Sequence, residues 1–200
     1  MKIGLFGGSF NPVHNGHVRL AQTFLGFLGL DKVFIIPTNI PPHKTNETFA
    51  SAEDRYEMCL RAFPGEAFSV SRTEIDRGGK SYTIDTIKRF QLDFPDAELF
   101  LLVGSDMLLY FDKWYRYDEL LKMCTLCAVS RMYSEDYSIM RSYARDVLGD
   151  KEDSIVIMQT EPYELSSTEI RELRKKGTDV SGYVPQSVAE YMESRGLYLD

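Results

Sequence analysis

Two histidines, His14 and His17, stand three residues apart in a glycine-rich segment near the start of the chain. Residues 7–17 read Gly-Gly-Ser-Phe-Asn-Pro-Val-His-Asn-Gly-His, between an apolar run at Ile3–Phe6 and an apolar-periodic run from Val18. This order predicts a strand, a turn-rich loop and the start of a helix. Glycine lets the backbone approach a ligand, and the first N–H groups of a helix carry partial positive charge. The segment therefore predicts an anion site, and we expect a nucleotide phosphate as its ligand.

A second polar segment lies near the other end of the chain. Ser166, Ser167 and Thr168 precede a short predicted helix that carries Arg171. Hydroxyl residues in such a place are often helix caps. Three hydroxyls with first-turn amides and an arginine also make a site for a polyphosphate. Both interpretations remain open on these residues alone.

Loops after other predicted strands hold further candidates. Lys44 follows two prolines that keep its loop extended, and it offers a cation to a phosphate, although a solvated lysine is the ordinary interpretation. Gly104 and Asp106 follow a predicted strand, at a place where an acid commonly accepts hydrogen bonds from ribose hydroxyls.

Aromatic and hydroxyl residues form another set of candidates. Tyr82 and Thr83 open a predicted helix, whose first amides suit a carboxylate or a phosphate. Trp114, the only tryptophan, and Tyr115 offer flat rings for stacking, although aromatic residues more often belong to a core.

Strand and helix patterns alternate along the chain. The strand-like runs are Ile3–Phe6, Lys32–Ile36, Ala67–Ser71, Leu99–Val103, Leu126–Val129 and Ile155–Met158. The helix-like runs are His17–Leu28, Ala52–Phe63, Thr83–Phe94, Tyr117–Met123, Tyr137–Val147, Thr168–Lys175 and Gln186–Ser194. This alternation predicts an α/β fold, a Rossmann-like doubly wound parallel sheet with helices on both faces and a short helical C-terminal part.

Length and composition predict one globular domain over residues 1–200. The net charge of -7 argues against a general nucleic-acid binder, which usually carries a basic face. The first residues break into glycine before a signal-peptide apolar region, and no apolar run approaches membrane-spanning length, so we expect a cytoplasmic protein without a membrane partner. A homo-oligomer is compatible with the sequence.

Three cysteines, Cys59, Cys124 and Cys127, are interpreted as buried core thiols, because the Cys-x-x-Cys pair has no second pair or nearby histidine to complete a zinc site. The charged, tyrosine-rich segment from Ser134 to Asp153 has Ile139, Tyr143 and Val147 at helical spacing. This spacing predicts a surface helix beside the sheet.

The two polar segments together resemble the nucleotidyltransferase superfamily. Gly-Gly-Ser-Phe-Asn-Pro-x-His-x-Gly-His resembles its His-x-Gly-His motif, and Leu-Ser-Ser-Thr-Glu-Ile-Arg resembles its second motif. Ile-Pro-Pro-His-Lys44, Ser81-Tyr-Thr-Ile-Asp-Thr, Gly104-Ser-Asp and Lys113-Trp-Tyr are similar to the bacterial nicotinate-nucleotide adenylyltransferases. The resemblance covers residues 1–131 and 161–200, so it implies nothing about the segment between them.

The resemblance implies adenylyl transfer from ATP to nicotinate mononucleotide, with Mg²⁺ carried by ATP and no protein-held metal. The implied catalytic residues are His14, His17 and Arg171. The implied ATP-binding residues are Gly7, Gly8, Ser9, Phe10, Gly16, Gly104, Asp106, Ser166, Ser167 and Thr168. The implied residues for nicotinate mononucleotide are Asn11, Lys44, Tyr82, Thr83, Trp114, Tyr115 and Arg131.

Three alternatives remain at this point. Asn11 stands where bacterial members more often have aspartate, and its segment is also similar to eukaryotic enzymes that act on the amide form of the mononucleotide. A sister adenylyltransferase for pantetheine phosphate or a cytidylyltransferase is a second alternative, and a nucleotide-sensing module without turnover is a third. A dehydrogenase is disfavoured because the opening loop lacks Gly-x-Gly-x-x-Gly.

Overall fold

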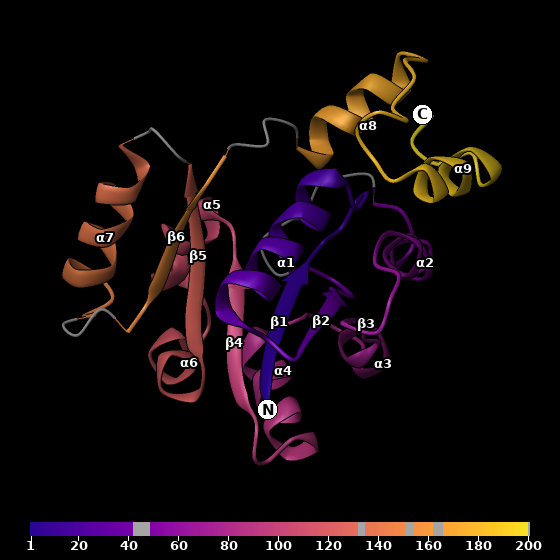
Figure 1. Ribbon diagram of the computed structural model, residues 1–200. Helices are drawn as coiled ribbons and strands as arrows, with labels where there is room; N and C mark the ends of the chain where they lie inside the picture. The colour runs from indigo at the N-terminus through magenta and orange to yellow at the C-terminus, as the bar shows by residue number, and fades with distance from the viewer. Residues whose placement is uncertain (42–48, 132–134, 151–153, 162–165, 200) are drawn as a thin grey trace. The chain divides into compact units, whose positions relative to one another are not determined.

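A computed structural model describes residues 1–41, 49–131, 135–150, 154–161 and 166–199 of the chain (Figure 1). The chain divides into two compact units. The first consists of Met1–Phe6 and Tyr82–Tyr163, and the second consists of Gly7–Ser81 and Glu164–Asp200.

The strands form a six-stranded sheet in the order β3-β2-β1-β4-β5-β6. Their bounds are β1 Lys2–Gly8, β2 Lys32–Pro37, β3 Phe68–Val70, β4 Glu98–Val103, β5 Thr125–Arg131 and β6 Val156–Thr160. The pairings of β1 with β4, β4 with β5, β5 with β6 and β2 with β3 are all parallel. The predicted α/β fold with a doubly wound parallel sheet is therefore confirmed.

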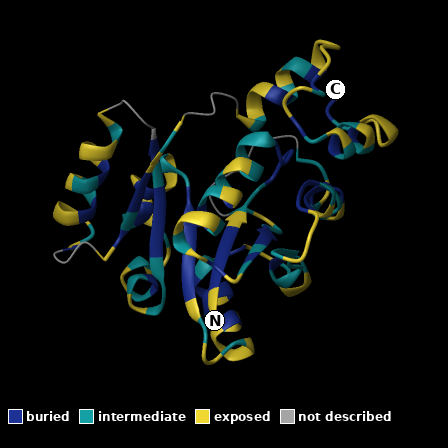
Figure 2. Ribbon diagram, viewed as in Figure 1, coloured by how far each residue is buried: buried dark blue, intermediate teal, exposed yellow. Residues whose placement is uncertain are grey.

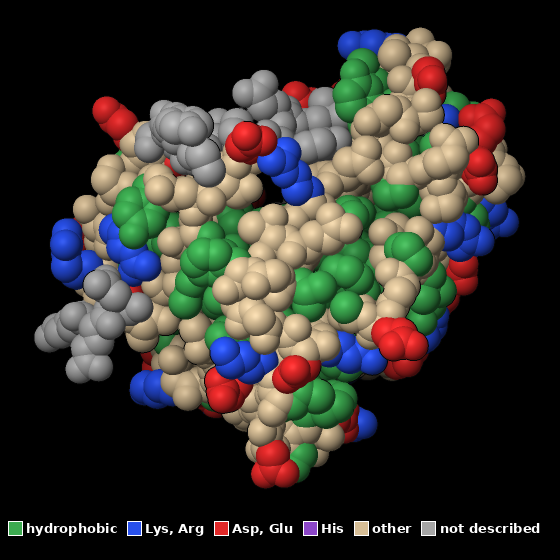
Figure 3. All heavy atoms as spheres, in the orientation of Figure 1, with side chains coloured by type: hydrophobic (Ala, Val, Ile, Leu, Met, Phe, Trp, Pro, Cys, Tyr) green, Lys and Arg blue, Asp and Glu red, His purple; other side chains and the backbone are tan. Residues whose placement is uncertain are grey.

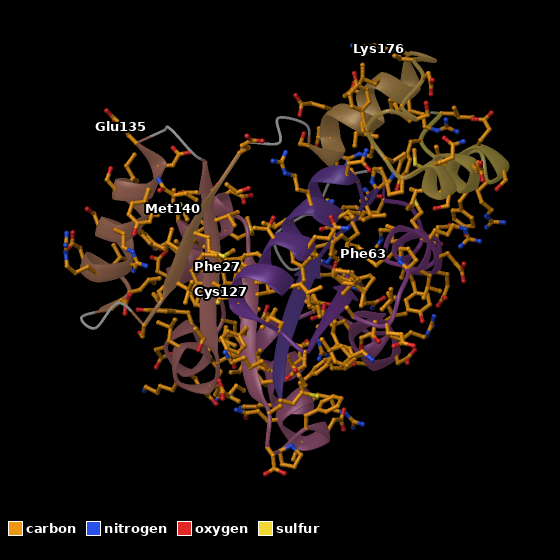
Figure 4. The ribbon with its side chains drawn as sticks, in the orientation of Figure 1. Phe27, Phe63, Cys127, Glu135, Met140 and Lys176 are labelled. Carbon is orange, nitrogen blue, oxygen red and sulfur yellow. The ribbon has the colours of Figure 1, made fainter. Side chains whose placement is uncertain are left out.

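The core of the first unit is formed by continuous apolar strands. Residues 99–103 of β4 and 126–128 of β5 are buried, as expected for parallel strands that are covered on both faces. In Figure 2 these strands are mostly dark blue. Cys127 and Met140, both labelled in Figure 4, are fully buried. The unit's helices are α4 Thr83–Asp93, α5 Ser105–Leu108, the 3-10 helix η1 Phe111–Lys113, α6 Tyr117–Met123 and α7 Asp136–Asp146.

Helix α7 confirms the surface helix predicted in the charged segment. Met140 and Ala144 are the buried residues of α7, which packs beside β5 and β6. Ile139 and Val147 are exposed instead. The small Ala144 on the buried side of α7 allows close packing against the sheet.

The second unit holds the helices α1 Asn15–Leu28, α2 Ala52–Ala62, α3 Thr73–Arg77, α8 Ser167–Lys175 and α9 Gln186–Ser194. Helices α2 and α9 pack together through Tyr191, whose hydroxyl donates to Asp54 Oδ1 at 2.8 Å. The Arg61 guanidinium lies 4.3 Å from the centre of the Tyr191 ring. The predicted helical C-terminal part is therefore present as α8 and α9.

The seven longer helices match the predicted runs within two residues at each end, whereas α3, α5 and η1 were not predicted. The three missed helices have five residues or fewer, too short to show a helical period. Cys59 and Cys127 are buried and Cys124 is partly buried, which agrees with their interpretation as core thiols. Burial raises the pKa of Cys124 and Cys127 to about 12, so both stay as neutral thiols.

Candidate active site

The loop after β1 is shaped around Phe10. This residue is buried and has a φ of 47°, in the left-handed region that residues other than glycine rarely adopt. Its ring packs edge-on against the ring of His17, with 5.0 Å between centroids. A Cβ at Gly8 would lie only 3.1 Å from the Phe10 ring, so a side chain there would press on the buried ring. The Phe10 side chain therefore supports the loop from inside, and only its backbone is placed to meet a ligand.

The two histidines form one unit at the start of α1, with His14 as the N-cap. The backbone N–H of His14 donates to His17 Nδ1 at 3.2 Å, and the two ring centroids lie 3.7 Å apart. Because Nδ1 accepts this hydrogen bond, the proton of a neutral His17 ring is on Nε2. His17 is therefore oriented to donate a hydrogen bond through Nε2, as binding of a phosphate oxygen requires.

His14 differs from His17 in its burial. Desolvation lowers the pKa of the buried His14 side chain to about 4, so its ring is neutral at pH 7. A neutral imidazole can donate one hydrogen bond to a ligand but brings no charge. The arrangement suits recognition of phosphate by donors at a helix start rather than proton abstraction.

The second polar segment holds the first one in place. Ser167 Oγ donates to the carbonyl oxygen of Pro12 at 2.9 Å, and Arg171 Nη1 donates to the carbonyl oxygen of Asn11 at 2.8 Å. Arg171 Nη2 also donates to Thr168 Oγ1 at 3.2 Å. The structure thus brings the two predicted phosphate segments together within one unit, although they are about 150 residues apart.

Ser166 has the capping role that the sequence left open. Its hydroxyl accepts from the backbone N–H of Glu169, and the Glu169 carboxylate accepts from the backbone N–H of Ser166 at 2.7 Å. This reciprocal pair is a capping box. A ligand phosphate near Ser166 would therefore meet a helix start that is already ordered, with Ser167 and Thr168 in its first turn.

Two residues of this region were not found from the sequence. Arg55 of α2 is 2% exposed, and its guanidinium donates to three backbone carbonyls, those of Ser9, Asn39 and Ala50. Tyr198 is buried and donates from its hydroxyl to Asn11 Oδ1 at 2.7 Å. The sequence signal that could have identified Arg55 is a charged residue on the apolar stripe of a helix, beside Met58 and Cys59. Tyr198 carries no such signal beyond its place in an apolar tail.

Asn11 is engaged by the protein itself. Its Oδ1 accepts from Tyr198 and also from the backbone N–H of Ala50 at 3.0 Å. The side chain is almost fully buried. The predicted role of Asn11 toward the mononucleotide stays a prediction, and the described contacts give it a part in holding the loop.

Three of the candidate residues for the mononucleotide in the first unit are aromatic. The rings of Tyr82 and Tyr115 lie 5.1 Å apart, and those of Trp114 and Phe111 lie 5.0 Å apart. Tyr115 is 59% exposed and Trp114 is half-buried. Tyr82 is the N-cap of α4 and Thr83 is its first residue. Of these rings, that of Tyr115 is the most exposed and could stack with an aromatic ligand.

Gly104 and Asp106 lie at the start of α5, after β4. A Cβ at Gly104 would lie 2.8 Å from Asp106 Oδ1, so a side chain there would make this carboxylate shift. Asp106 is exposed and available to a ligand hydroxyl. Lys44 lies outside the described residues, and Arg131 is described only as the last residue of β5.

Known proteins of one family are similar to this chain over most of its length. The family model for cytidylyltransferase-like proteins matches residues 5–173. A probable nicotinate-nucleotide adenylyltransferase of Thermotoga maritima is 42% identical over 193 residues, which cover 96% of this chain and 91% of the relative. The nicotinate-nucleotide adenylyltransferase of Bacillus subtilis is 35% identical over 198 residues and 98% of each protein. The chain belongs to the nicotinate-nucleotide adenylyltransferase family.

Solved structures similar to this family member extend the comparison of the fold. The Plasmodium falciparum nicotinic acid mononucleotide adenylyltransferase complexed with NaAD has a TM-score of 0.74 at 15% identity, over 98% of this chain and 97% of that one. The same protein complexed with APC also gives 0.74, at 16% identity, over 98% of this chain and 96% of that one. These likenesses confirm the Rossmann-like fold.

As a nicotinate-nucleotide adenylyltransferase, the protein is an enzyme of the nucleotidyltransferase class. Among the described residues, no three His, Cys, Asp or Glu side chains are grouped so that they could hold a metal ion. The described helices also include none with the length and apolar character needed to cross a bilayer. Basic and acidic side chains are mixed over α8 and α9 in Figure 3.

Proposed function

We propose that this enzyme transfers the adenylyl group of ATP to nicotinate mononucleotide, giving nicotinate adenine dinucleotide and pyrophosphate in NAD biosynthesis. A phosphate oxygen of the mononucleotide forms a bond to the α-phosphorus of ATP. The bond from that phosphorus to the bridging oxygen of the β-phosphate breaks, and pyrophosphate leaves with the electron pair. The second pKa of a phosphate monoester is about 6, so the attacking oxygen is already ionised near neutral pH. The reaction therefore needs no general base.

The main requirement is to stabilise charge on the phosphates while the reacting groups are in line. His17 would donate from Nε2 to the α-phosphate, and His14 would contribute a neutral donor. Backbone amides of residues 7–10 and 16, together with Ser167, Thr168 and the start of α8, would bind the triphosphate. Arg171 would bring positive charge to it as well as holding the loop.

The remaining candidate residues would bind the other parts of the two substrates. Gly104 and Asp106 would contact the adenosine ribose. Thr83 would donate to the nicotinate carboxylate, with Tyr82, Trp114 and Tyr115 around the pyridine ring. Lys44 and Arg131 would meet the anionic groups of the mononucleotide, and Asn11 would position the loop beside it.

Magnesium enters this proposal as part of the ATP substrate. The described side chains do not form a cluster suited to a resident cation, and Mg²⁺ is commonly bound through substrate phosphates. We also propose that residues 1–200 act as one catalytic domain in the cytoplasm on these small substrates, without a nucleic-acid or membrane partner. A homo-oligomer is compatible with this proposal.

One observation carries the assignment of roles. The hydrogen bonds of Ser167 and Arg171 to Pro12 and Asn11 join the two polar segments at the loop that precedes His17. A polyphosphate can thereby meet donors from both segments. A sensing module would need donors for binding but not a histidine whose Nδ1 is fixed by the backbone so that Nε2 donates.

The decisive experiment measures pyrophosphate release by the purified protein with ATP, Mg²⁺ and one acceptor at a time. The acceptors are nicotinate mononucleotide, nicotinamide mononucleotide and pantetheine phosphate, with CTP replacing ATP in a parallel set. We expect release with ATP and nicotinate mononucleotide, and nicotinate adenine dinucleotide as the product on chromatography. Higher turnover with the amide would overturn the acceptor assignment, and ATP binding without product would favour the sensing module.

A further inference from the structure

We propose that Arg55 and Tyr198 are positioning residues for adenylyl transfer, acting as a buried clamp that fixes the phosphate-binding loop from α2 and from the C-terminal segment. The inference rests on the proposed function and adds to it a role for two residues outside both recognised motifs. It is carried by hydrogen bonds, burial and backbone conformation within the second unit.

Arg55 joins three separate stretches of backbone. Its Nη1 donates to the carbonyl of Ser9 at 2.9 Å, its Nη2 to that of Asn39 at 3.0 Å and its Nε to that of Ala50 at 3.2 Å. One planar guanidinium thus connects the loop after β1, the loop after β2 and the approach to α2. A lysine could not replace it, because an ammonium is a point donor without this fork geometry.

The bond to Ser9 also orients the next amide. A trans peptide directs its N–H opposite to its C=O. Because the Ser9 carbonyl points toward Arg55, the N–H of Phe10 points away from Arg55. The guanidinium therefore sets the direction of a backbone donor in the loop proposed to meet the ATP phosphates.

Burying an arginine against carbonyl groups is a costly way to stabilise a fold. The desolvation cost of a buried charge must be offset by hydrogen bonds. A protein with apolar residues of similar volume in such places is often at least as stable. Each described bond of the Arg55 guanidinium goes to a neutral carbonyl oxygen. This arrangement keeps a positive charge behind a loop that is proposed to bind a triphosphate, where the charge also favours the ligand.

Tyr198 reaches the same loop from the other end of the chain. Its hydroxyl donates to Asn11 Oδ1 at 2.7 Å, across 187 residues of sequence. Tyr198 has a φ of 62°, in the left-handed region, an uncommon conformation for a tyrosine. Burial raises the pKa of Tyr198, so the hydroxyl keeps its proton and remains a donor. The C-terminal segment is therefore held in a strained form with its tyrosine on the loop.

The test compares Tyr198→Phe with Tyr191→Phe. Each variant loses one tyrosine hydroxyl and one hydrogen bond of nearly equal length, 2.7 Å to Asn11 for Tyr198 and 2.8 Å to Asp54 for Tyr191. Only the first bond touches the phosphate-binding loop. We expect Tyr198→Phe to lower kcat about tenfold and ATP affinity about threefold, because small displacements of donors weaken the transition state more than the bound substrate. We expect Tyr191→Phe to change each value less than about twofold.

Thermal unfolding of both variants separates positioning from stability. Similar decreases in Tm in the two variants, with a lower kcat in Tyr198→Phe than in Tyr191→Phe, would support the clamp. Equal kcat in the two variants would overturn it. Arg55→Lys, checked for folding by circular dichroism, should lose more kcat than Tyr198→Phe, and wild-type kcat in the folded variant would contradict the role of Arg55.

Failure of the proposed function is distinguishable from failure of the clamp. It would appear as wild-type protein that releases no pyrophosphate with nicotinate mononucleotide. ATP affinity, measured by calorimetry without an acceptor, would then still test the clamp proposal. Equal affinities of the Tyr198→Phe and Tyr191→Phe variants would overturn it.

Discussion

Two regions of the molecule hold candidate site residues, one in each unit, and they are built in different ways. The phosphate region, residues 7–17 with 166–171, is fixed by buried or partly buried donors to its carbonyl groups. The aromatic region, comprising Tyr82, Trp114 and Tyr115, is formed by rings whose centroids lie about 5 Å from a neighbouring ring. Tyr115 is largely exposed, whereas Phe10, Asn11 and His14 of the phosphate region are buried.

The difference follows from what each region is proposed to do. Charge that develops during phosphoryl transfer is stabilised by dipoles that already point in the right direction, so small displacements are costly. A ring that binds by stacking tolerates displacement, because its contact energy is spread over many atoms. Substitutions in the phosphate region should therefore change kcat, and those in the aromatic region should change KM for the mononucleotide.

The largest effect is expected at His17. His17→Ala should lower kcat by a factor on the order of a hundred or more, as found for loss of one transition-state donor. His17→Asn is the matched variant, because an amide oxygen can still accept from the His14 N–H while the imidazole donor at Nε2 is lost. Steady-state kinetics should show a low kcat in both variants. Thermal unfolding should show a smaller decrease in Tm for His17→Asn than for His17→Ala. Near-normal turnover in His17→Ala would remove His17 from the mechanism.

A pH titration of stability tests the burial of His14. Its pKa is about 4 in the folded protein and 6.5 ordinarily, so below pH 6.5 the unfolded chain binds a proton that the folded protein excludes. Stability should be unaffected by this group above pH 6.5 and should fall as the pH falls toward 4. Between pH 7 and pH 5 this group should lower the free energy of unfolding by about 2 kcal/mol. Denaturant unfolding at several pH values should show this additional decrease in the wild type but not in His14→Asn. Parallel curves of unfolding free energy against pH for the two proteins would contradict the buried neutral state.

Trp114 tests the aromatic region. Trp114→Ala should raise KM for nicotinate mononucleotide about tenfold, because stacking of a base on an aromatic side chain contributes roughly 1–3 kcal/mol. Its kcat should change less than about threefold, and KM for ATP should stay close to that of the wild type. Trp114→Phe, which keeps a ring, should recover part of the loss. A variant that loses kcat instead would erase the contrast between the two regions.

The smallest effect is expected at Tyr143, in the segment that the family resemblance does not cover. Its hydroxyl donates to Asp112 Oδ1 at 2.6 Å and accepts from the Asp112 N–H at 3.2 Å, in the 3-10 helix just before Trp114. Tyr143→Phe should lower unfolding free energy by about 1 kcal/mol and raise KM for the mononucleotide about threefold. Tyr137→Phe on the same helix is the control and should behave as wild type. Equal KM values in the two variants would leave Tyr143 with a structural role only.

The sequence by itself determined the elements and the chemistry. Apolar runs and helical periods located the six strands and the longer helices, because these patterns depend on which residues face the core. The cap at Ser51, whose side chain accepts from the Asp54 N–H, was also predictable, since capping is local. The two polar segments identified the family for a similar reason, because their glycine, histidine and hydroxyl residues are chemically suited to phosphate at those positions.

The tertiary structure alone decided what holds the site in place. Arg55 and Ser9 are 46 residues apart, and Asn11 and Tyr198 are 187 apart, yet each pair shares a hydrogen bond. Which donor satisfies a buried carbonyl depends on which segments the fold brings together, and no local pattern contains that information. The same reason explains why the helical spacing of Ile139 and Val147 did not show that Met140 and Ala144 are the buried residues of α7. Residue types set the chemistry of the phosphate loop, and long-range hydrogen bonds set its shape.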